Sequence, residues 1–329
     1  MEKLTILSFG AGQDSTYILY RMMRDSSYKK NWVNGNLVVI MSDTGNEHPE
    51  TYRQIDFAAK LCASHQIPFF FITPDMGYHP RTWQSLTGQF KLNDSIMSKM
   101  FPRSCTDNLK LRPFYNFLND SIHRTFYPAL TADSLPGKIK RTTFPPKFFV
   151  KQFVKDTGTR IRVILGIAAG EEKRVKLSKQ ELKNLQLSLF STNLPKRKQP
   201  VWMDKCIEKV YPMITEGADR SMAQQYILAT PWPLPVPSNC MFCPFKNKIE
   251  VLWLHRNYPE SFEEWAGMEA SKIQKSKSKG LPDDRNLGVN GLKLLPEYLK
   301  EAIEEFGHMT DSELEEYRMS HGHCVMSTY

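Results

Sequence analysis

The sequence contains no long apolar run and no internal repeat. In its 329 residues there is no uninterrupted apolar stretch of about 18 residues, the length that a membrane-spanning helix requires. The N-terminus enters a strand-like segment directly, without the apolar core of a signal peptide. We therefore expect a cytoplasmic protein with no membrane attachment.

Cysteine is scarce, and the charge is one-sided. The chain has 6 cysteines, which in a reducing compartment are metal ligands, reactive thiols or core residues rather than disulfides. Its net charge is +9, which favours anionic partners such as nucleotides, DNA or RNA. Basic residues concentrate at 138–160, 173–198 and 272–279, although solvated surface is the alternative interpretation of each segment.

Short apolar runs alternate with helical patterns in the first half of the chain. This order predicts an α/β fold, in which a twisted parallel sheet carries helices on both faces. Strands are predicted at 4–9, 37–41, 68–72 and 161–167, and helices at 15–24, 49–62, 81–86 and 107–119.

The second half of the chain changes character. We divide the chain into an α/β domain, 1–230, and a cysteine-containing helical region, 231–329. A basic insertion at about 125–160 is predicted to be irregular. Its phenylalanines lie among lysines, and they either stack on nucleic-acid bases or pack on the core. Helical patterns in the C-terminal region lie at 249–255, 261–271, 297–306 and 311–319.

The first motif lies between the first predicted strand and the first helix. Small residues there let backbone N–H groups approach phosphate oxygens, and the helix N-terminus adds a partial positive charge. An ordinary tight turn is the alternative, because the loop lacks the Gly-Lys-Ser/Thr ending of a Walker A loop. The predicted nucleotide-binding residues are Ser8, Phe9, Gly10, Ala11, Gly12, Gln13, Asp14, Ser15 and Thr16.

The second motif, SDTGNEHPETY from Ser42, follows the second predicted strand. It lies at a carboxyl edge of the sheet, where open α/β sheets bind ligands. Asp43, with Thr44 and Gly45, is predicted to bind ribose or a magnesium ion there. The alternative is that these residues only shape the turn.

Together the two motifs resemble the PP-loop ATP pyrophosphatase superfamily, in particular its phosphoadenylyl-sulfate (PAPS) reductase-like branch. Three later segments match elements of that branch, so that five matches in order cover 8–245. The first is an Arg-x-Cys-Thr element followed by a lysine and a proline, at 103–113. The second is a Gly-Ile…Glu-x-x-Arg element, at 166–174. The third resembles the Cys-x-x-Cys-Pro-Phe element of phage and mobile-element members, at 238–245.

The resemblance implies a nucleotide-binding fold of the adenine nucleotide alpha hydrolase (HUP) type and an enzyme that attacks ATP, with Mg²⁺, at the α-phosphate and releases pyrophosphate. It also implies that cations neutralise the leaving pyrophosphate. By resemblance, Gly166 joins the nucleotide site, and the catalytic residues are Asp14, Arg103, Lys110, Glu171 and Arg174.

The family includes DNA- and tRNA-thiolating enzymes. The expected function is therefore adenylation of an acceptor, with nucleic acid as a candidate, followed by sulfur transfer that a sulfur-donor protein supports. The alternatives are a PAPS or adenylyl-sulfate reductase and a non-catalytic nucleotide-sensing or DNA-binding partner protein. Two departures weigh against the reductase: Gln13 replaces the usual loop lysine, and the tail from Ser320 reads SHGHC instead of Glu-Cys-Gly-x-His.

A Cys-x-x-Cys pair, Cys240 and Cys243, suits zinc or an iron–sulfur cluster. Cys105 belongs to a matched motif and Cys324 lies in a His/Cys-rich tail, so these two are the candidates that complete a 4Fe–4S site. Zinc with a tail histidine as ligand remains an alternative, and so do four uncoordinated thiols.

Overall fold

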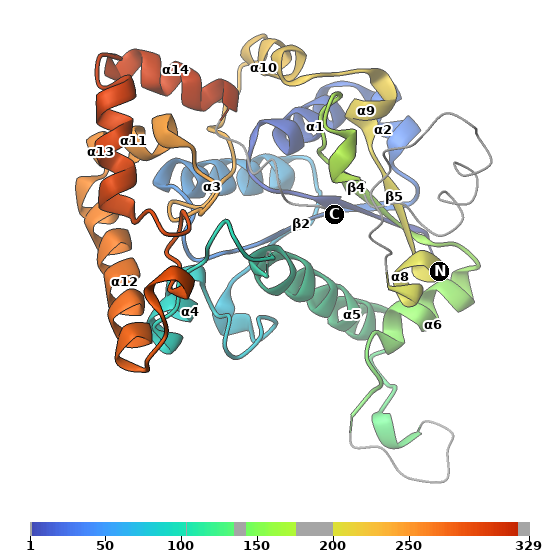
Figure 1. Ribbon diagram of the computed structural model, residues 1–329. Coiled ribbons are helices and arrows are strands. Elements are labelled where there is room, and N and C mark those ends of the chain that lie inside the picture. Colours follow the sequence, from blue (N-terminus) through green and yellow to red (C-terminus); the bar gives the residue numbers. More distant parts are fainter. Residues whose placement is uncertain (1, 103, 135–142, 176–199, 322–329) are drawn as a thin grey trace, which may run out of the picture.

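The structure, a computed structural model, describes residues 2–102, 104–134, 143–175 and 200–321 (Figure 1). A five-stranded parallel sheet lies at its centre, with the strand order β3-β2-β1-β4-β5. The predicted α/β class is confirmed. The strands are β1 (Leu4–Ser8), β2 (Asn36–Ser42), β3 (Phe69–Ile72), β4 (Ile161–Leu165) and β5 (Ile207–Val210).

The strand order reverses beside β1. The chain moves outward from β1 through β2 to β3, then crosses to the other side of β1 and forms β4 and β5. In open α/β sheets the crevice at such a reversal, outside the carboxyl ends of the strands, is the usual ligand site. Ser8 and Leu165 end the two strands that border this crevice.

Helices cover both faces of the sheet because its strands are apolar on both sides. On one face, α1 (Gln13–Arg24), α3 (Pro49–Ser64) and α10 (Arg220–Leu228) share a core with the sheet. On the other face, α5 (Arg112–Phe126) and α6 (Phe148–Thr157) do so, together with α8 (Val201–Cys206). Figure 1 shows α1 and α10 above the sheet and α5 below it. The short helices α2 (Ser26–Trp32) and α9 (Pro212–Glu216) lie near α1.

A third core lies beside the sheet and is helical. It joins the C-terminal helices to α4 and to Leu109, which come from the first part of the chain. The four C-terminal helices were all predicted, and each is confirmed. The division at 230/231 stays a prediction. The helices are α4 (Leu86–Asn93), α11 (Lys248–Asn257), α12 (Pro259–Ser278), α13 (Leu295–Phe306) and α14 (Asp311–His321).

Three sequence-based expectations are corrected. The helix predicted at 81–86 is wrong, because α4 begins only at Leu86, where the Ser85 side chain caps it by accepting a hydrogen bond from the Gly88 amide. The helix predicted at 107–119 opens with a π-helical turn, η2 (Thr106–Leu111). Strand β5 was missed because its segment, IEKV, has two charged residues; one of them, Glu208, pairs with Arg162 on β4.

The insertion at about 125–160 is not irregular throughout its described part, because it contains α6. Phe149 and Phe153 on this helix are 2% and 1% exposed, and Phe144 and Phe148 pack against the same core. The packing interpretation is therefore confirmed for Phe149 and Phe153, whose burial leaves no ring face for a base, whereas base stacking by the half-buried Phe144 and Phe148 stays a prediction. Among the described residues, no helix combines the length and the apolar character that a membrane span needs. The cytoplasmic location stays a prediction.

Candidate functional site

The glycine-rich loop connects the end of β1 to the start of α1. Ala11 adopts a left-handed backbone conformation, with φ of 53°, which is uncommon for a residue with a Cβ atom and is typical of functional loops. Gly12 is the N-cap of α1, and it provides no side-chain cap. The first-turn amides of α1 have no partner within the helix, so this N-terminus suits an anion.

The loop lies at the carboxyl edge of the sheet, as expected, but it is partly covered. Ser8 and Gly10 are half-buried, and the rest of the loop is buried. Ser238 lies against Gly12 so closely that a Cβ atom on the glycine would come within 2.7 Å of the Ser238 Cβ atom. A ligand therefore has to approach from the side of Ser8 and Gly10.

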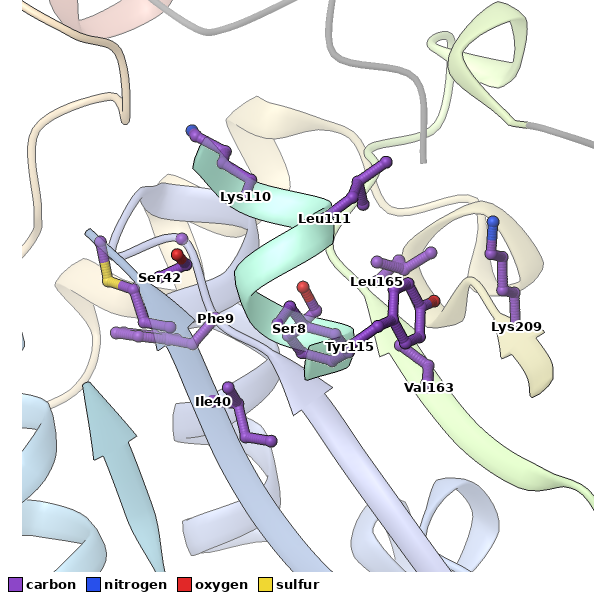
Figure 2. Close-up of a pocket in the computed structure, with 13 residues that line it drawn as sticks. Ser8, Phe9, Ile40, Ser42, Lys110, Leu111, Tyr115, Val163, Leu165 and Lys209 are labelled. Atoms are coloured by element: carbon purple, nitrogen blue, oxygen red, sulfur yellow. The ribbon is translucent and has the colours of Figure 1, made fainter. Parts of the chain in front are cut away.

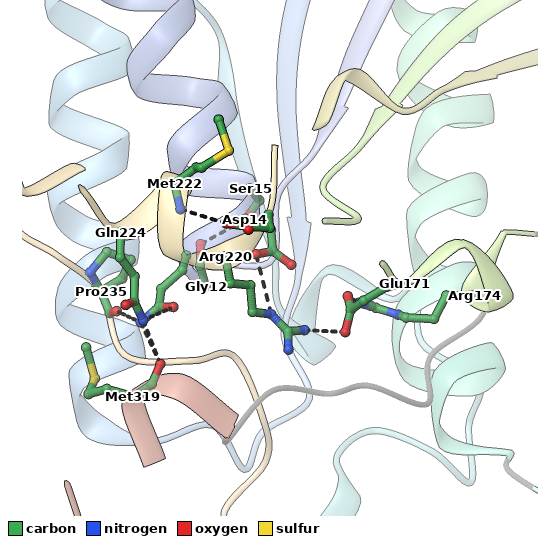
Figure 3. Close-up of polar contacts among 12 residues, drawn as sticks. Gly12, Asp14, Ser15, Glu171, Arg174, Arg220, Met222, Gln224, Pro235 and Met319 are labelled. Atoms are coloured by element: carbon green, nitrogen blue, oxygen red, sulfur yellow. Dashed lines mark hydrogen bonds and ion pairs between the residues drawn. The ribbon is translucent and has the colours of Figure 1, made fainter. Parts of the chain in front are cut away.

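Four charged residues form a network beside the loop (Figure 3). The Arg220 Nη2 atom is 2.6 Å from Glu171 Oε1, and its Nε atom is 3.8 Å from Asp14 Oδ1. Arg174 Nη1 is 2.5 Å from Glu171 Oε2. Asp14, Glu171 and Arg174 were predicted as catalytic residues, and the fold brings them together across more than 150 residues of sequence. Two guanidinium groups at the end of β1 suit the neutralisation of phosphate charge.

Burial raises the pKa of the Asp14 carboxyl to about 6, and the nearby Glu171 carboxylate acts in the same direction. The Arg220 and Arg174 guanidinium groups oppose this rise. The carboxyl is therefore ionised at neutral pH but at a cost in free energy, because its charge is removed from water. A bound cation next to Asp14 would remove this cost.

The variant Asp14→Asn is expected to be more stable than the wild type at pH 7.5. The carboxyl titrates near about 3.9 in the unfolded chain and at about 6 in the folded protein, so its burial costs nothing below about pH 4 and the full amount above pH 6. We expect the variant to raise the free energy of unfolding by about 1–3 kcal/mol at pH 7.5, and by much less at about pH 4. Urea denaturation of both proteins at the two pH values measures this, and an equal difference at both would contradict it.

In the second loop, which follows β2 and begins at Ser42, the Asp43 side chain accepts hydrogen bonds from within the same segment. Its Oδ1 atom accepts hydrogen bonds from the Gly45 amide, at 2.8 Å, and from the Tyr52 hydroxyl, at 3.0 Å. The Thr44 hydroxyl donates to Glu47 at 3.0 Å. These contacts show that Asp43 and Thr44 shape the turn. A further role of Asp43 toward a ribose or a magnesium ion stays a prediction.

A small cavity of about 40 Å³ lies at the carboxyl ends of β1, β2 and β4 (Figure 2). It has room for a few water molecules only, so a nucleoside does not fit it without a rearrangement of the lining residues. The η2 segment, which borders the cavity, is a π-helical turn, and such turns are common at functional sites. Lys110 and Lys209 extend from opposite sides of the cavity. The wall is otherwise mostly apolar and includes Phe9, Ile40, Met41, Leu111, Phe114, Tyr115, Val163 and Leu165, with Ser8, Gly10 and Ser42 at the loop side.

Gly166, which follows β4, touches the first turn of α1. A Cβ atom on this glycine would lie 2.8 Å from the Ser15 amide nitrogen and 3.0 Å from the Asp14 carbonyl carbon. Glycine is therefore required for the close approach of the two segments. The structure places Gly166 in contact with the backbone of the loop to which the sequence analysis assigned it.

The cysteine segment docks on both loops. Cys240 forms an antiparallel bridge with Glu47, and its Sγ atom lies 3.4 Å from the Thr44 hydroxyl. Burial and the Glu47 carboxylate raise the pKa of the Cys240 thiol well above its ordinary value, against the opposing charge of Lys110. The thiol is therefore protonated at neutral pH as the structure stands.

The described residues include three of the four predicted metal ligands, Cys105, Cys240 and Cys243. Cys240 and Cys243 lie on one turn, in which the Cys243 amide donates to the Cys240 carbonyl at 3.2 Å. Within the described part of the chain, no three Cys, His, Asp or Glu side chains come close enough together to hold a metal ion. Cys105 packs against the same helical core as Cys240. Cys324 and Arg103 lie outside the described residues.

Two lysines, the buried Lys246 and the half-buried Lys110, act electrostatically on the thiol pair. Lys246 is 3% exposed, and burial lowers the pKa of its ammonium group while the Glu250 carboxylate and the Cys243 and Cys240 thiols oppose this. The charge of Lys110 also acts on Cys240. The Lys110 charge opposes the burial that keeps the Cys240 thiol protonated, and positive charge of this kind favours a thiolate-ligated centre. Cys240 and Cys243 fit such a centre in charge, and their metal binding stays a prediction.

Sequence analysis missed three residues at the site: Arg220, Ser238 and Lys209. Arg220 lies 46 residues after Arg174 and in no recognised motif, so no local signal pointed to it. Ser238 is the first residue of the matched cysteine segment but was given no role, and Lys209 lies on the strand that was missed. Only the fold places these side chains beside the loop.

Comparison with known proteins adds little. No protein-family model matches the sequence, and no curated protein matches it. Among solved structures, the U34-tRNA thiolase NcsA from Methanococcus maripaludis, with its 4Fe-4S cluster, is similar at 12% identity and a TM-score of 0.32, over 94% of this chain and 75% of that chain. A TM-score this low carries no argument about fold or function, so the functional proposal depends on the geometry of the site.

Proposed function

We propose that this protein is a PP-loop ATP pyrophosphatase-like enzyme, which uses MgATP to adenylate an acceptor and then supports sulfur transfer to it. One observation carries the proposal. The uncapped N-terminus of α1 follows β1 at the reversal of strand order, and two arginines and two carboxylates surround it. Backbone amides and guanidinium groups are the donors that bind polyphosphate, and carboxylates hold Mg²⁺.

In the proposed reaction an acceptor oxygen attacks the α-phosphorus of ATP. A new phosphorus–oxygen bond forms, the bond to the β-phosphate oxygen breaks, and pyrophosphate leaves with the electron pair. Arg174 neutralises the charge that accumulates on the leaving group. Glu171 orients the Arg174 guanidinium group and, with Asp14, is a candidate magnesium ligand.

The small cavity is the proposed nucleoside site. It adjoins Ser8 and Gly10 of the loop, and its apolar wall suits a base. Lys110 lies at its edge on the π-helical turn. We propose that this turn moves outward when a nucleotide binds, since the cavity of about 40 Å³ is smaller than a nucleoside.

The cysteines support the sulfur-transfer half of the proposal. Cys240 contacts Thr44 of the second loop, so the thiol pair adjoins the edge at which ATP is proposed to bind. Cys240, Cys243, Cys105 and Cys324 are the proposed ligands of an iron–sulfur cluster, with zinc as the alternative. In the transfer step a sulfur nucleophile displaces AMP from the adenylated acceptor, forming a carbon–sulfur bond as the carbon–oxygen bond breaks.

The proposed acceptor is a nucleic acid. The net charge of +9 supports this class, because an excess of lysine and arginine favours polyanions. A separate sulfur-donor protein is also part of the proposal.

Pyrophosphate release tests the proposed function. Anaerobically purified protein with MgATP and either bulk tRNA or duplex DNA is expected to release pyrophosphate, with dependence on the nucleic acid. Asp14→Ala is expected to reduce this release at least about 100-fold, as when a group that positions the reacting atoms is lost. The matched control is Asp56→Ala, an exposed carboxylate on α3. Absence of pyrophosphate with every acceptor would contradict the proposal.

A further inference from the structure

The phosphate loop contains no cation of its own. The segment from Ser8 to Thr16 has neither lysine nor arginine, and its one charged side chain is Asp14. A bound polyphosphate would bring several negative charges next to this carboxylate. If the loop binds such a ligand, a cation has to come from another part of the chain.

Gln13 cannot substitute for that cation, because its side chain is used elsewhere. The side chain is fully buried, and its amide nitrogen donates to the carbonyls of Pro235 and Met319, each at 3.2 Å. Its amide oxygen accepts a hydrogen bond from Gln224 Nε2 at 2.9 Å. Gln13 therefore connects the loop to α10 and to the end of α14.

This connection fixes the position of α10. Gln224 lies one helical turn after Arg220, so both side chains project from one face of the helix. Gln224 holds the loop at Gln13, and Arg220 lies beside the next loop residue, Asp14. Ala223 and Ile227 of α10 are fully buried in the core that α1 shares. The helix thus presents Arg220 to the loop from a rigid support.

The Arg220 guanidinium retains hydrogen-bonding capacity. One of its nitrogens pairs with Glu171, but Nε has no hydrogen-bond partner within the described part of the chain, and neither has Asp14 Oδ1. The two atoms are 3.8 Å apart, which is beyond hydrogen-bond distance. The side chain is 19% exposed, so its charge is only weakly screened by water. A partly buried cation with an unused donor beside an uncapped helix N-terminus is suited to bind phosphate oxygen.

We infer that Arg220 is the polyphosphate-binding cation of this loop, and that the Gln13–Gln224 contact positions it. The inference rests on the proposed function, in that ATP is the ligand, and it adds a binding residue from outside the loop. On ligand binding, Arg220 turns from Asp14 to a phosphate oxygen and keeps its contact with Glu171.

Nucleotide affinity of Arg220→Gln tests this inference. Calorimetric titration with MgATP, MgADP and adenosine is expected to show that the variant binds MgATP about 10- to 100-fold more weakly, which is the loss of one charged hydrogen-bonding partner. Adenosine affinity is expected to be unchanged, because adenosine has no phosphate. Arg220→Lys keeps the charge and is expected to lose less. The matched control, Arg124→Gln, removes an exposed arginine of α5 and should behave as the wild type.

A second variant tests the positioning role. Gln224→Ala leaves the guanidinium in place but removes the hydrogen bond to Gln13, and it is expected to weaken MgATP binding by a smaller factor than Arg220→Gln. If Arg220→Gln fails to fold, Arg220→Lys and Gln224→Ala provide the same comparison between ATP and adenosine.

The outcomes separate the inference from the proposed function. If wild-type protein binds no MgATP, the proposed function fails and the inference fails with it. If the wild type binds MgATP and Arg220→Gln binds it equally well, only the inference is overturned. Equal losses of ATP and adenosine affinity would mean that Arg220 has a structural role, which also overturns it.

Discussion

Replacement of Gly166 by alanine is expected to weaken MgATP binding about 100-fold and to destabilise the protein. The methyl group would lie 2.8 Å from the Ser15 amide nitrogen and 3.0 Å from the Asp14 carbonyl carbon, which is closer than van der Waals contact allows. Both neighbours are backbone atoms, so no side-chain rotation relieves the overlap. The first turn of α1 would have to move away from β4.

We expect two separate losses from this displacement. Overpacking of this kind lowers the free energy of unfolding by about 1–3 kcal/mol. A shift of the donors by about 1 Å lowers affinity or rate about 100-fold, because the phosphate-binding amides and Asp14 belong to the displaced turn. Calorimetric titration with MgATP and urea denaturation measure the two losses.

Two other glycines provide controls for Gly166→Ala. A Cβ atom on Gly267, in α12, meets no atom within 4 Å, so Gly267→Ala is expected to bind MgATP normally and to gain stability, by about 0.5–1 kcal/mol. On Gly10 the added atom would meet the Ser238 hydroxyl at 3.7 Å, an ordinary contact, so Gly10→Ala should keep the stability of the wild type. Wild-type affinity in Gly166→Ala would contradict the placement of the nucleotide on this loop.

Loss of bound metal is the second large effect that we expect. Anaerobically purified wild-type protein should contain iron and acid-labile sulfide. Cys240→Ala should contain at least about tenfold less of both, because even the loss of a residue that only supports a metal ligand commonly lowers metal affinity about tenfold. Cys240 is the informative position because its Sγ atom lies 3.4 Å from the Thr44 hydroxyl and the charge of Lys110 acts on its thiol.

The control for metal binding is Cys62→Ala. Cys62 is fully buried in the core between α3 and the sheet, and burial raises the pKa of its thiol to about 12, so it is neither accessible nor ionised. This variant should keep the wild-type metal content. Zinc instead of iron in the wild type would favour the alternative metal. Equal metal content in wild type and Cys240→Ala, or no metal in either, would contradict the proposed centre.

Much of the fold follows from local pattern. The apolar runs predicted β1 to β4 within two residues at each end, because strands buried on both faces are nearly continuous in Val, Ile, Leu and Phe. The C-terminal helices followed from helical spacing of apolar residues. The same rule failed at β5, a short edge strand with two adjacent charged residues, Glu208 and Lys209, and at 81–86, where a cap at Ser85 delays the helix.

Part of the candidate site could likewise be predicted from the sequence, and part could not. The loop from Ser8 to Thr16 could be predicted, since small residues between a strand and a helix are a local signature. Arg220 could not, because its role depends on the packing of α10 against α1 and on the Gln224–Gln13 contact. The covering of Gly12 by Ser238 was also beyond prediction, as it joins residues 226 positions apart.

The sequence by itself determined the α/β class, the turn of small residues after the first strand, and the identity of the Cys240–Cys243 pair. The tertiary structure alone decided which distant charges reach that turn, how far it is covered, and that the phenylalanines of the insertion belong to the core. The physical reason is the separation in sequence between the residues that determine each feature. Strand burial, helix spacing and turn geometry are set by neighbours in sequence, whereas the partners of Asp14 and Cys240 are set by packing of segments far apart in the chain.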